Sequence, residues 1–291
     1  FQVVKIIVRF PADKYVINNI FAIVVNCILI ILTISLNAVS IITIAKSSQL
    51  KNKLCYFIIF IQSLIDLAVG VSGVPLFITF LVSQVNGVSN CISAFLSLRL
   101  TYLTVGTSMV MLSALTMDRY IAILHPYSYC KIVTKKRVLL YVGSGAALIA
   151  LVASLSVFVQ RLIIQYFTGA IILPFFVLTV TAYRKIFKVI KNSSRYPHES
   201  KARDPERTKL LLKEIKQARS CFIVVIGFVV CLLPIALAVP FVLILGRFDA
   251  DAIRNWVITC FVSNSSVNSM LFFWTKKLLR REARKVLKTL C

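Results

Sequence analysis

The stretch SALTMDRYIAILHP, residues 113–126, ends a long apolar run with a charged pair, Asp118 and Arg119. The run begins near residue 90 and has the length of a helix that crosses a membrane. Ionised side chains are costly in such a helix, so they usually serve function rather than packing. The stretch therefore predicts a membrane-spanning helix with a functional charge pair at its end.

The composition is that of a membrane protein. Of the 291 residues, 59% are hydrophobic, and the mean hydropathy is +0.88, whereas soluble domains are far more polar. The net charge of +24 could indicate a nucleic-acid partner, but the Lys and Arg residues lie between apolar runs. That arrangement is typical of basic loops beside a membrane, so we expect no nucleic-acid partner. None of the eight cysteines forms a C-x-x-C pair, which argues against a zinc or dithiol site.

Seven apolar runs are long enough to span a bilayer. We expect an extracellular N-terminal arm at 1–15, which could also lie on the membrane surface, a helical bundle at 16–275, and an amphipathic helix on the membrane surface at 276–291. The predicted spans are about 16–45, 54–82, 90–124, 138–159, 162–190, 208–245 and 252–275.

The basic residues predict which side of the membrane each loop faces. The segments 46–53, 125–137, 184–219 and 276–291 contain 26 of the 34 Lys and Arg residues. Cytoplasmic loops carry the excess of Lys and Arg in membrane proteins. We therefore expect the N-terminus outside and the C-terminus in the cytoplasm.

Polar residues inside the spans indicate two sites. Asp66 is the only carboxylate deep in a span, and hard cations such as sodium prefer oxygen ligands. The alternative is that Asp66 has no role in a site and is only hydrogen-bonded to its neighbours. The candidate partners of Asp66 in a sodium site are Ser108, Asn264, Ser265 and Asn268.

The pair at the end of the third span could act as a switch. Arg119 could pair with Asp118 beside it or with Glu214 at the start of the sixth span, and such a pair is closed or open as the helices move. The alternative is an arginine that extends to lipid phosphates. Three prolines within spans, Pro75, Pro174 and Pro234, predict kinks.

The sequence resembles the rhodopsin-like (class A) G protein-coupled receptors over nearly its whole length, with one set of matches per helix in the family's order. The resemblance implies an all-α membrane protein with a seven-transmembrane helix bundle and a short amphipathic eighth helix. The residues that carry it are Asn37, Asp66 in SLIDLA, Asp118-Arg119-Tyr120 with Pro126, Pro174, Phe228, Cys231, Pro234, Asn264 and Asn268, with Glu214 at the position of the acidic partner of the arginine.

The sequence also departs from the family. Leu232 replaces a tryptophan, Ser269 a proline and Phe272 a tyrosine. These departures concern the activation switch and not the fold. Cys91 lies about a turn before the usual disulfide cysteine, and no cysteine occurs between 131 and 220 to pair with it. Two explanations stay open: a second extracellular loop is missing between about 158 and 162, or the loop is minimal, as in melanocortin-like receptors. The lack of turn residues there favours the first.

The resemblance places the ligand in the outer half of the bundle. Thr101 replaces the aspartate that binds amines, and Val262 replaces the retinal-binding lysine, so an amine receptor and an opsin are disfavoured. An apolar pocket suits a lipophilic small molecule or an apolar peptide end, although several of these side chains could serve packing alone. The expected lining is Thr101, Tyr102, Val105, Tyr166, Ala170, Leu232, Ile235, Ala236, Val239, Ile258 and Val262.

The resemblance also implies a heterotrimeric G protein as partner at the cytoplasmic face of the plasma membrane. Asp118, Arg119, Tyr120 and Glu214 would form the switch, and Tyr127 would reach into the partner. Membrane lipids would bind the basic tail, and Cys291 is a candidate for lipidation. We expect no cofactor apart from sodium as a candidate modulator, and no enzyme activity. The alternative is a secondary transporter or channel, although no inverted repeat appears.

Overall fold

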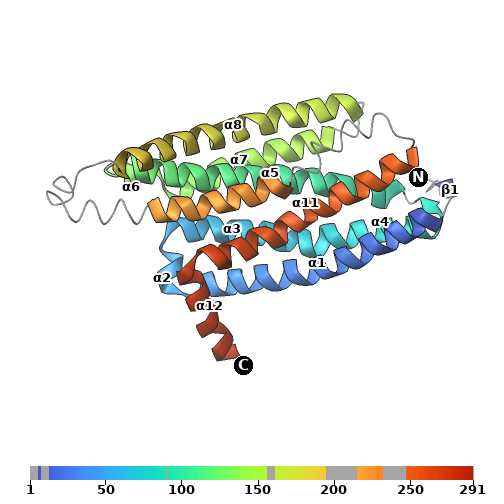
Figure 1. The fold of residues 1–291 in the computed structure, drawn as a ribbon, viewed down its shortest axis with the longest axis horizontal. Helices are drawn as coiled ribbons and strands as arrows, with labels where there is room; N and C mark the ends of the chain where they lie inside the picture. Colours follow the sequence, from blue (N-terminus) through green and yellow to red (C-terminus); the bar gives the residue numbers. More distant parts are fainter. Residues whose placement is uncertain are drawn as a thin grey trace. The chain divides into compact units, whose positions relative to one another are not determined.

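The computed structural model describes residues 6–7, 13–89, 91–155, 161–194, 215–231 and 247–290 (Figure 1). Within these residues the chain is almost entirely helical. The short elements are β1 (Ile6–Ile7), α2 (Ser48–Lys51), η1 (Val69–Gly73), β2 (Val88–Ser89) and α6 (Tyr129–Ile132); the longer helices are α1 (Asp13–Lys46), α3 (Leu54–Ala68), α4 (Val74–Val85), α5 (Cys91–Leu124), α7 (Lys135–Leu155), α8 (Arg161–Ser194), a helix over 215–231, α11 (Arg247–Thr275) and α12 (Lys277–Leu290).

Most of the predicted spans correspond to these helices. Within the described residues, five helical stretches are long and apolar enough to cross a membrane. They are 15–46, 54–85, 103–124, 135–155 and 251–275. The predicted fifth span corresponds to α8, and of the predicted sixth span the structure describes 215–231.

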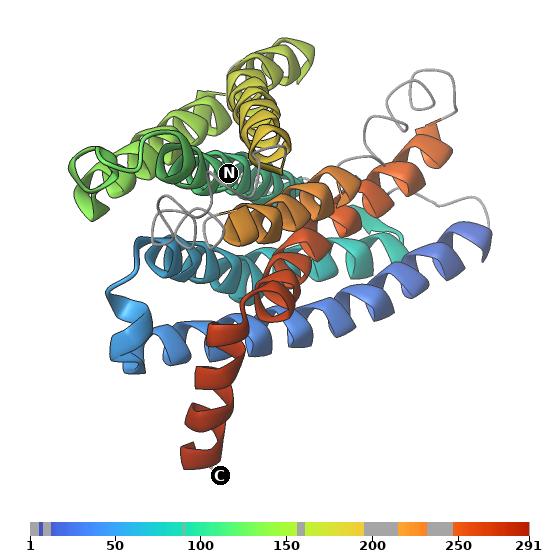
Figure 2. The same ribbon diagram turned by 60° about the vertical axis from the view of Figure 1, so that its left-hand side comes forward.

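The chain forms two compact units, and we describe each by itself. Unit 1 contains 1–47, 60–105 and 226–291, and unit 2 contains 48–59 and 106–225. In unit 1, α1 packs along α11 and α4, and α12 turns away from the end of α11 to contact α1 (Figures 1 and 2). In unit 2, α7 packs against α8.

The second span contains a widened turn before its proline. Pro75 has no N–H and its ring disturbs the helical turn that precedes it. The turn before Pro75 is the π-helix η1. In it, the Val74 N–H donates to the Val69 carbonyl five residues earlier. The kink expected at Pro75 therefore takes the form of a π-bulge that joins α3 to α4.

One end of unit 1 carries a small sheet. β1 pairs antiparallel with β2, with Ile6 opposite Ser89 and Ile7 opposite Val88. Gly87, just before β2, has φ of 67°, a conformation that favours glycine. The N-terminal arm is therefore attached to the loop that follows α4, a contact that the sequence did not predict.

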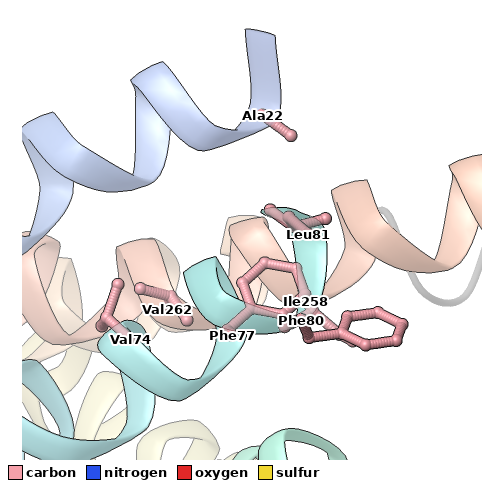
Figure 3. Close-up of a cluster of buried hydrophobic side chains, with 7 residues drawn as sticks. All are labelled: Ala22, Val74, Phe77, Phe80, Leu81, Ile258 and Val262. Atoms are coloured by element: carbon pink, nitrogen blue, oxygen red, sulfur yellow. The ribbon is translucent and has the colours of Figure 1, made fainter. Parts of the chain in front are cut away.

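The core of unit 1 lies between α1, α4 and α11 (Figure 3). Its apolar side chains are buried, which suits the segments expected in the apolar part of a bilayer. The cluster consists of Ala22, Val74, Phe77, Phe80, Leu81, Ile258 and Val262.

In unit 2, α5 and α7 approach each other at two glycines. A Cβ on Gly145 would lie 2.8 Å from Val110 Cγ1, and a Cβ on Gly106 would lie 2.8 Å from Ile149 Cδ1. Such distances are shorter than side chains tolerate, so only glycine allows this separation of the helices. Gly143, by contrast, has no atom within 4 Å of its Cβ position among the described residues.

Candidate functional site

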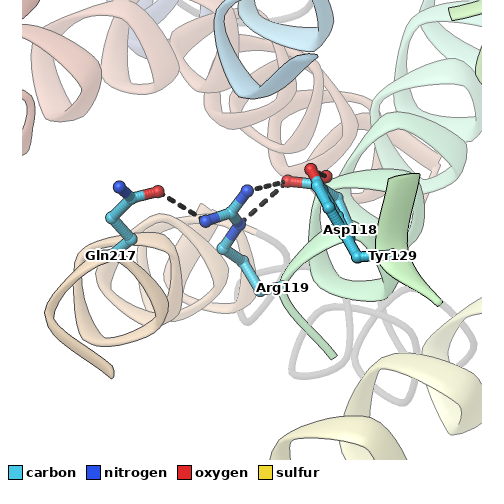
Figure 4. A network of polar contacts seen from close by, with 4 residues as sticks. All are labelled: Asp118, Arg119, Tyr129 and Gln217. Atoms are coloured by element: carbon cyan, nitrogen blue, oxygen red, sulfur yellow. Dashed lines mark hydrogen bonds and ion pairs between the residues drawn. The ribbon is translucent and has the colours of Figure 1, made fainter. Parts of the chain in front are cut away.

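The charge pair at the end of α5 is buried and hydrogen-bonded on both sides (Figure 4). Asp118 is 1% exposed and Arg119 4% exposed. Arg119 Nε donates to Asp118 Oδ2 at 2.8 Å, and Nη2 donates to the same oxygen. Tyr129 OH, on α6, donates to Asp118 Oδ1 at 2.6 Å. Both carboxylate oxygens are therefore engaged, as a buried charge requires.

Arg119 also reaches a second helix. Its Nη1 donates to Gln217 Oε1, on the helix 215–231, at 2.5 Å (Figure 4). The guanidinium thus joins α5 to the helix 215–231 through the Gln217 side-chain amide. Because Gln217 is neutral, this bond is weaker than an ion pair would be.

The two partners expected for Arg119 have different outcomes. Pairing with Asp118 is confirmed by the ion pair between them. Glu214 lies outside the described residues. In the sequence, Gln217 follows Glu214 by three residues, a spacing that would place two side chains on one face of the predicted sixth helix. This spacing could have indicated Gln217. Tyr129 was missed because nothing in the sequence predicts that α6 folds back onto α5.

Aromatic side chains pack between α8 and the helix 215–231 in unit 2. Tyr183 and Phe187 on α8 pack against Phe222 on the helix 215–231, with ring centroids 5.1 and 4.8 Å from that of Phe222. Lys185 Nζ lies over the Tyr120 ring, 5.8 Å from the ring centroid. Tyr127, predicted to contact a partner, is 82% exposed. The helix 215–231 is therefore packed against α8 as well as joined to Arg119.

Asp66 lies fully buried on α3 among oxygen atoms of unit 1. Gln62 Nε2 donates to Asp66 Oδ2 at 2.8 Å. Ser265 and Asn268, on α11, lie close enough to interact with the Asp66 carboxyl group. Gln62 was not predicted, although its spacing of four residues from Asp66 on a helix could have indicated it.

Several of these oxygens are buried without a hydrogen bond from the residues that the structure describes. They are Asp66 Oδ1, Asn264 Oδ1, Gln62 Oε1 and Ser265 Oγ. Buried polar atoms without partners are costly, and oxygen atoms of this kind are the ligands that a hard cation prefers. The predicted group therefore fits a sodium ion. Ser108 is buried on the part of α5 that belongs to unit 2.

A ladder of hydrogen bonds joins α1 to α11. The partners advance together along both helices, so the two helices run parallel and begin at the same end of unit 1. The bonds are Asn255 Nδ2 to Asn19 Oδ1 at 3.1 Å, Asn26 Nδ2 to Thr259 Oγ1 at 2.9 Å, Thr33 Oγ1 with Ser266 Oγ at 2.6 Å, and Ser269 Oγ to Asn37 Oδ1 at 2.5 Å.

The residues expected to line a ligand pocket are only partly described. Ile258 and Val262 lie one turn apart on α11 and pack into the core of unit 1 (Figure 3). Val105 is half-buried on α5. Thr101, Tyr102, Tyr166 and Ala170 lie on described helices, but their side chains are outside the description, and Leu232, Ile235, Ala236 and Val239 lie outside it altogether.

The tail helix α12 is attached to the end of α1. Ser47 Oγ donates to Glu282 Oε2 at 3.1 Å, and Lys285 Nζ donates to Glu282 Oε1 at 2.8 Å. The hydrogen bond from Lys285 lowers the pKa of Glu282, so the carboxyl group is charged at neutral pH. Leu279 and Ala283 are buried beside it. Cys291, the candidate for lipidation, lies outside the described residues.

Comparison with known families identifies the central part of the chain. Residues 36–162 match the sequence model of a family described as 7 transmembrane receptor (rhodopsin family). The match includes Asn37, Asp66 and the Asp118-Arg119-Tyr120 sequence. No curated protein matches the chain. The match confirms the predicted family resemblance and the predicted fold class, an all-α membrane protein with the seven-transmembrane fold. The family is one of receptors rather than enzymes.

Proposed function

The chain carries a rhodopsin-family receptor domain, and from this premise we propose that it binds an extracellular ligand in the outer half of the helix bundle and activates a heterotrimeric G protein. Activation would proceed by outward movement of the sixth helix, which is predicted at about 208–245 and of which the structure describes 215–231. The observation that carries the proposal is the bond from Arg119 to Gln217, because it joins the third and sixth helices through one guanidinium.

The energetics of this bond suit a switch. A hydrogen bond between a charged and a neutral group contributes about 1.5–3 kcal/mol. A ligand that binds the open state tenfold to a hundredfold more tightly supplies about 1.4–2.8 kcal/mol, a similar amount. The Asp118–Arg119 pair stays on one helix and need not break. Movement of the sixth helix would then expose the Arg119 guanidinium to the G protein, and Tyr127 would contact the same partner.

The ligand is proposed to be a lipophilic small molecule or an apolar peptide end. The proposed lining comprises the residues expected from the sequence, none of which is a carboxylate. Such a pocket selects apolar ligands because an amine would lack a counter-ion. Ile258 and Val262 would contribute the part nearest the core of unit 1.

The buried oxygens around Asp66 are proposed to hold a sodium ion. The ligands would come from Asp66, Asn264, Ser265 and Asn268, with Gln62 added and Ser108 proposed from the third helix. A bound cation supplies a positive charge that neutralises the Asp66 carboxylate. Because α11 contributes three of the ligands, bound sodium would favour one arrangement of α11 and so modulate agonist affinity.

The protein is proposed to reside in the plasma membrane with its N-terminus outside. The distribution of Lys and Arg supports this orientation. Under it, α12 lies on the cytoplasmic surface with its basic residues toward anionic lipid, and lipidation of Cys291 would strengthen that attachment.

Loss of nucleotide exchange in an Arg119→Ala variant tests the proposed function. The variant should fold and reach the cell surface, but should activate G protein at least about tenfold less, basally and with ligand mixtures, because it lacks the guanidinium that would donate charge-assisted hydrogen bonds to the G protein in the open state. Lys188→Ala, an exposed change in the same unit, is the control. Wild-type exchange by Arg119→Ala would refute the switch. If neither the wild type nor any variant stimulates nucleotide exchange on the G protein, while the protein takes up solute into vesicles, the transporter or channel would be favoured.

A further inference from the structure

α1 carries a buried polar side chain at every seventh position. Asn19, Asn26, Thr33 and Ser40 lie on α1 and Ser47 directly follows it, and none of them is more than 8% exposed. A repeat of seven residues keeps these side chains on one face, and helices that pair through such a repeat stay in contact along their length. The seam of such a pair is normally apolar, so this polar seam requires partners on the facing helix.

α11 supplies partners along this seam. Asn26 and Thr33 each form a side-chain hydrogen bond with α11. One turn after Thr33, Asn37 bonds α11 twice: its Oδ1 accepts from the Ser269 hydroxyl at 2.5 Å, and its Nδ2 donates to the Ser265 carbonyl at 3.5 Å. Asn37 and Ser269 are fully buried. Sliding of α11 along α1 would therefore break several buried hydrogen bonds at once, which is costly in apolar surroundings.

Three carboxamides join the same two helices to α4 at the start of the seam. Asn255 Nδ2 donates to Asn19 Oδ1 at 3.1 Å and to Gln84 Oε1 at 2.9 Å, and Asn19 Nδ2 donates to the same Gln84 oxygen at 3.3 Å. None of the three side chains is more than 5% exposed. Because a carboxamide does not titrate in the physiological range, this three-way contact does not depend on pH.

The tail helix joins α1 and α11 at the other end of the seam. α12 follows α11 in the chain, and its Glu282 accepts a hydrogen bond from Ser47 at 3.1 Å. The end of α11 is thus held near the end of α1 through α12 as well as through the seam. Within unit 1, the two helices are therefore joined at both ends and between them.

Ser269 stands where the receptor family has a proline, and this difference strengthens the seam. α11 runs as one α-helix from Arg247 to Thr275. A proline at residue 269 would lack the N–H that bonds the carbonyl four residues earlier, and its ring would displace that carbonyl and kink the helix. It would also lack the hydroxyl that bonds Asn37. The serine therefore allows a straight α11 and adds a bond to α1.

We propose that α1 and α11 form one rigid pair, so that α11 neither slides along α1 nor bends away from it when the protein changes state. Any change that sodium causes in α11 is then shared by α1. Separation of the pair requires the loss of bonds at several levels, whereas the proposed release of the sixth helix breaks the bond from Arg119 to Gln217. The inference goes beyond the proposed function and rests on it only for the complex with G protein.

Spin labels at Lys46→Cys and Trp274→Cys test the rigid pair, because both residues are exposed near the ends of α1 and α11. The full-length protein, with Cys27 and Cys130 replaced by serine, is measured in nanodiscs by electron paramagnetic resonance. The conditions are sodium chloride, choline chloride and nucleotide-free G protein. The distance between the labels should be the same in all three. A distance that changes by several ångströms between any two conditions would overturn the proposal.

Variants of Ser269 supply the contrast. Ser269→Ala loses the bond to Asn37 and should melt about 2–4 °C below the wild type. Ser269→Pro also disturbs the helix, so it should melt lower still, and its label distance should differ between conditions. Ser263→Ala is the control, because the Ser263 hydroxyl donates to the Cys260 carbonyl of its own helix, and it should melt as the wild type does.

A wild-type melting temperature for Ser269→Pro would also overturn the rigid pair. The sodium and melting measurements contain no G protein, so they test the pair even if nucleotide exchange fails. A changing label distance in a protein that exchanges nucleotide would refute the rigid pair and leave the proposed function standing.

Discussion

At the scale of single residues, the hydrogen bond from Arg119 to the neutral Gln217 is the most informative detail. The Gln217 amide forms a hydrogen bond with Arg119 that is weak enough for ligand binding to break. A carboxylate at residue 217 would form a stronger bond with Arg119. The level of activity without ligand should therefore depend on residue 217.

Substitutions of Gln217 should move basal activity in opposite directions. Gln217→Ala removes the bond to Arg119 and should raise basal nucleotide exchange several-fold, because the closed state loses about 1.5–3 kcal/mol. Gln217→Glu should lower it by adding an ion pair. Exchange in membranes with purified heterotrimer measures both. The same basal rate in the two variants would show that this bond does not restrain the sixth helix.

Asp66 should make the protein sensitive to sodium. The purified wild type should melt at a higher temperature in sodium chloride than in choline chloride at equal ionic strength, because an ion that binds only the folded state stabilises it. Asp66→Asn should abolish the difference. A sodium-dependent shift that persists in Asp66→Asn would rule out the Asp66 site.

The sequence predicted some of these residues and not others for physical reasons. Asp66, Asp118 and Arg119 stand out because a charge in an apolar run has few explanations. Gln217, Gln62 and Tyr129 do not, because neutral polar residues are tolerated in many places. Their roles depend on which helix lies opposite.

At the scale of helices, prolines and small residues decide how the elements bend and pack. The kink expected at Pro75 is a π-bulge, a form that the position of a proline alone does not predict. The ladder between α1 and α11 could have been predicted from the sequence, because polar residues recur every seven positions at Asn19, Asn26 and Thr33. That spacing keeps polar groups on one face of a helix.

The glycines of α7 offer a matched pair for testing close packing. Gly145→Leu should destabilise the protein by about 1–3 kcal/mol, because the new side chain would overlap Val110. Gly143→Leu should have little effect, since its Cβ position meets no described atom within 4 Å. Thermal unfolding in one detergent measures both. Similar melting temperatures for the two variants would show that α5 and α7 are not in close contact at Gly145.

At the scale of the whole molecule, the amount of apolar sequence and the placement of basic residues carry most of the prediction. Runs of about twenty apolar residues can be satisfied only as spanning helices, which is why the fold class followed from the sequence. The pairing of β1 with β2 did not, because two-residue strands leave no periodic pattern. Which residues form the ligand pocket stays a prediction.

The proposed orientation makes the native Cys130 a reporter. Cys130 is exposed on α6, in a loop expected to face the cytoplasm. A membrane-impermeant maleimide should label it only in permeabilised cells, whereas Asn86→Cys, at the opposite end of the second span, should react in intact cells. The reverse labelling pattern would show that the protein has the opposite orientation in the membrane.

The central claim is that the bond between Arg119 and Gln217 opens as the sixth helix moves outward. Spin labels at Lys131→Cys and Lys216→Cys, with Cys130 and Cys27 replaced by serine, report the distance between α6 and the helix 215–231. Double electron–electron resonance should show one short distance in the protein alone and a distance longer by several ångströms with nucleotide-free G protein bound. An unchanged distance in a complex that exchanges nucleotide would contradict the account.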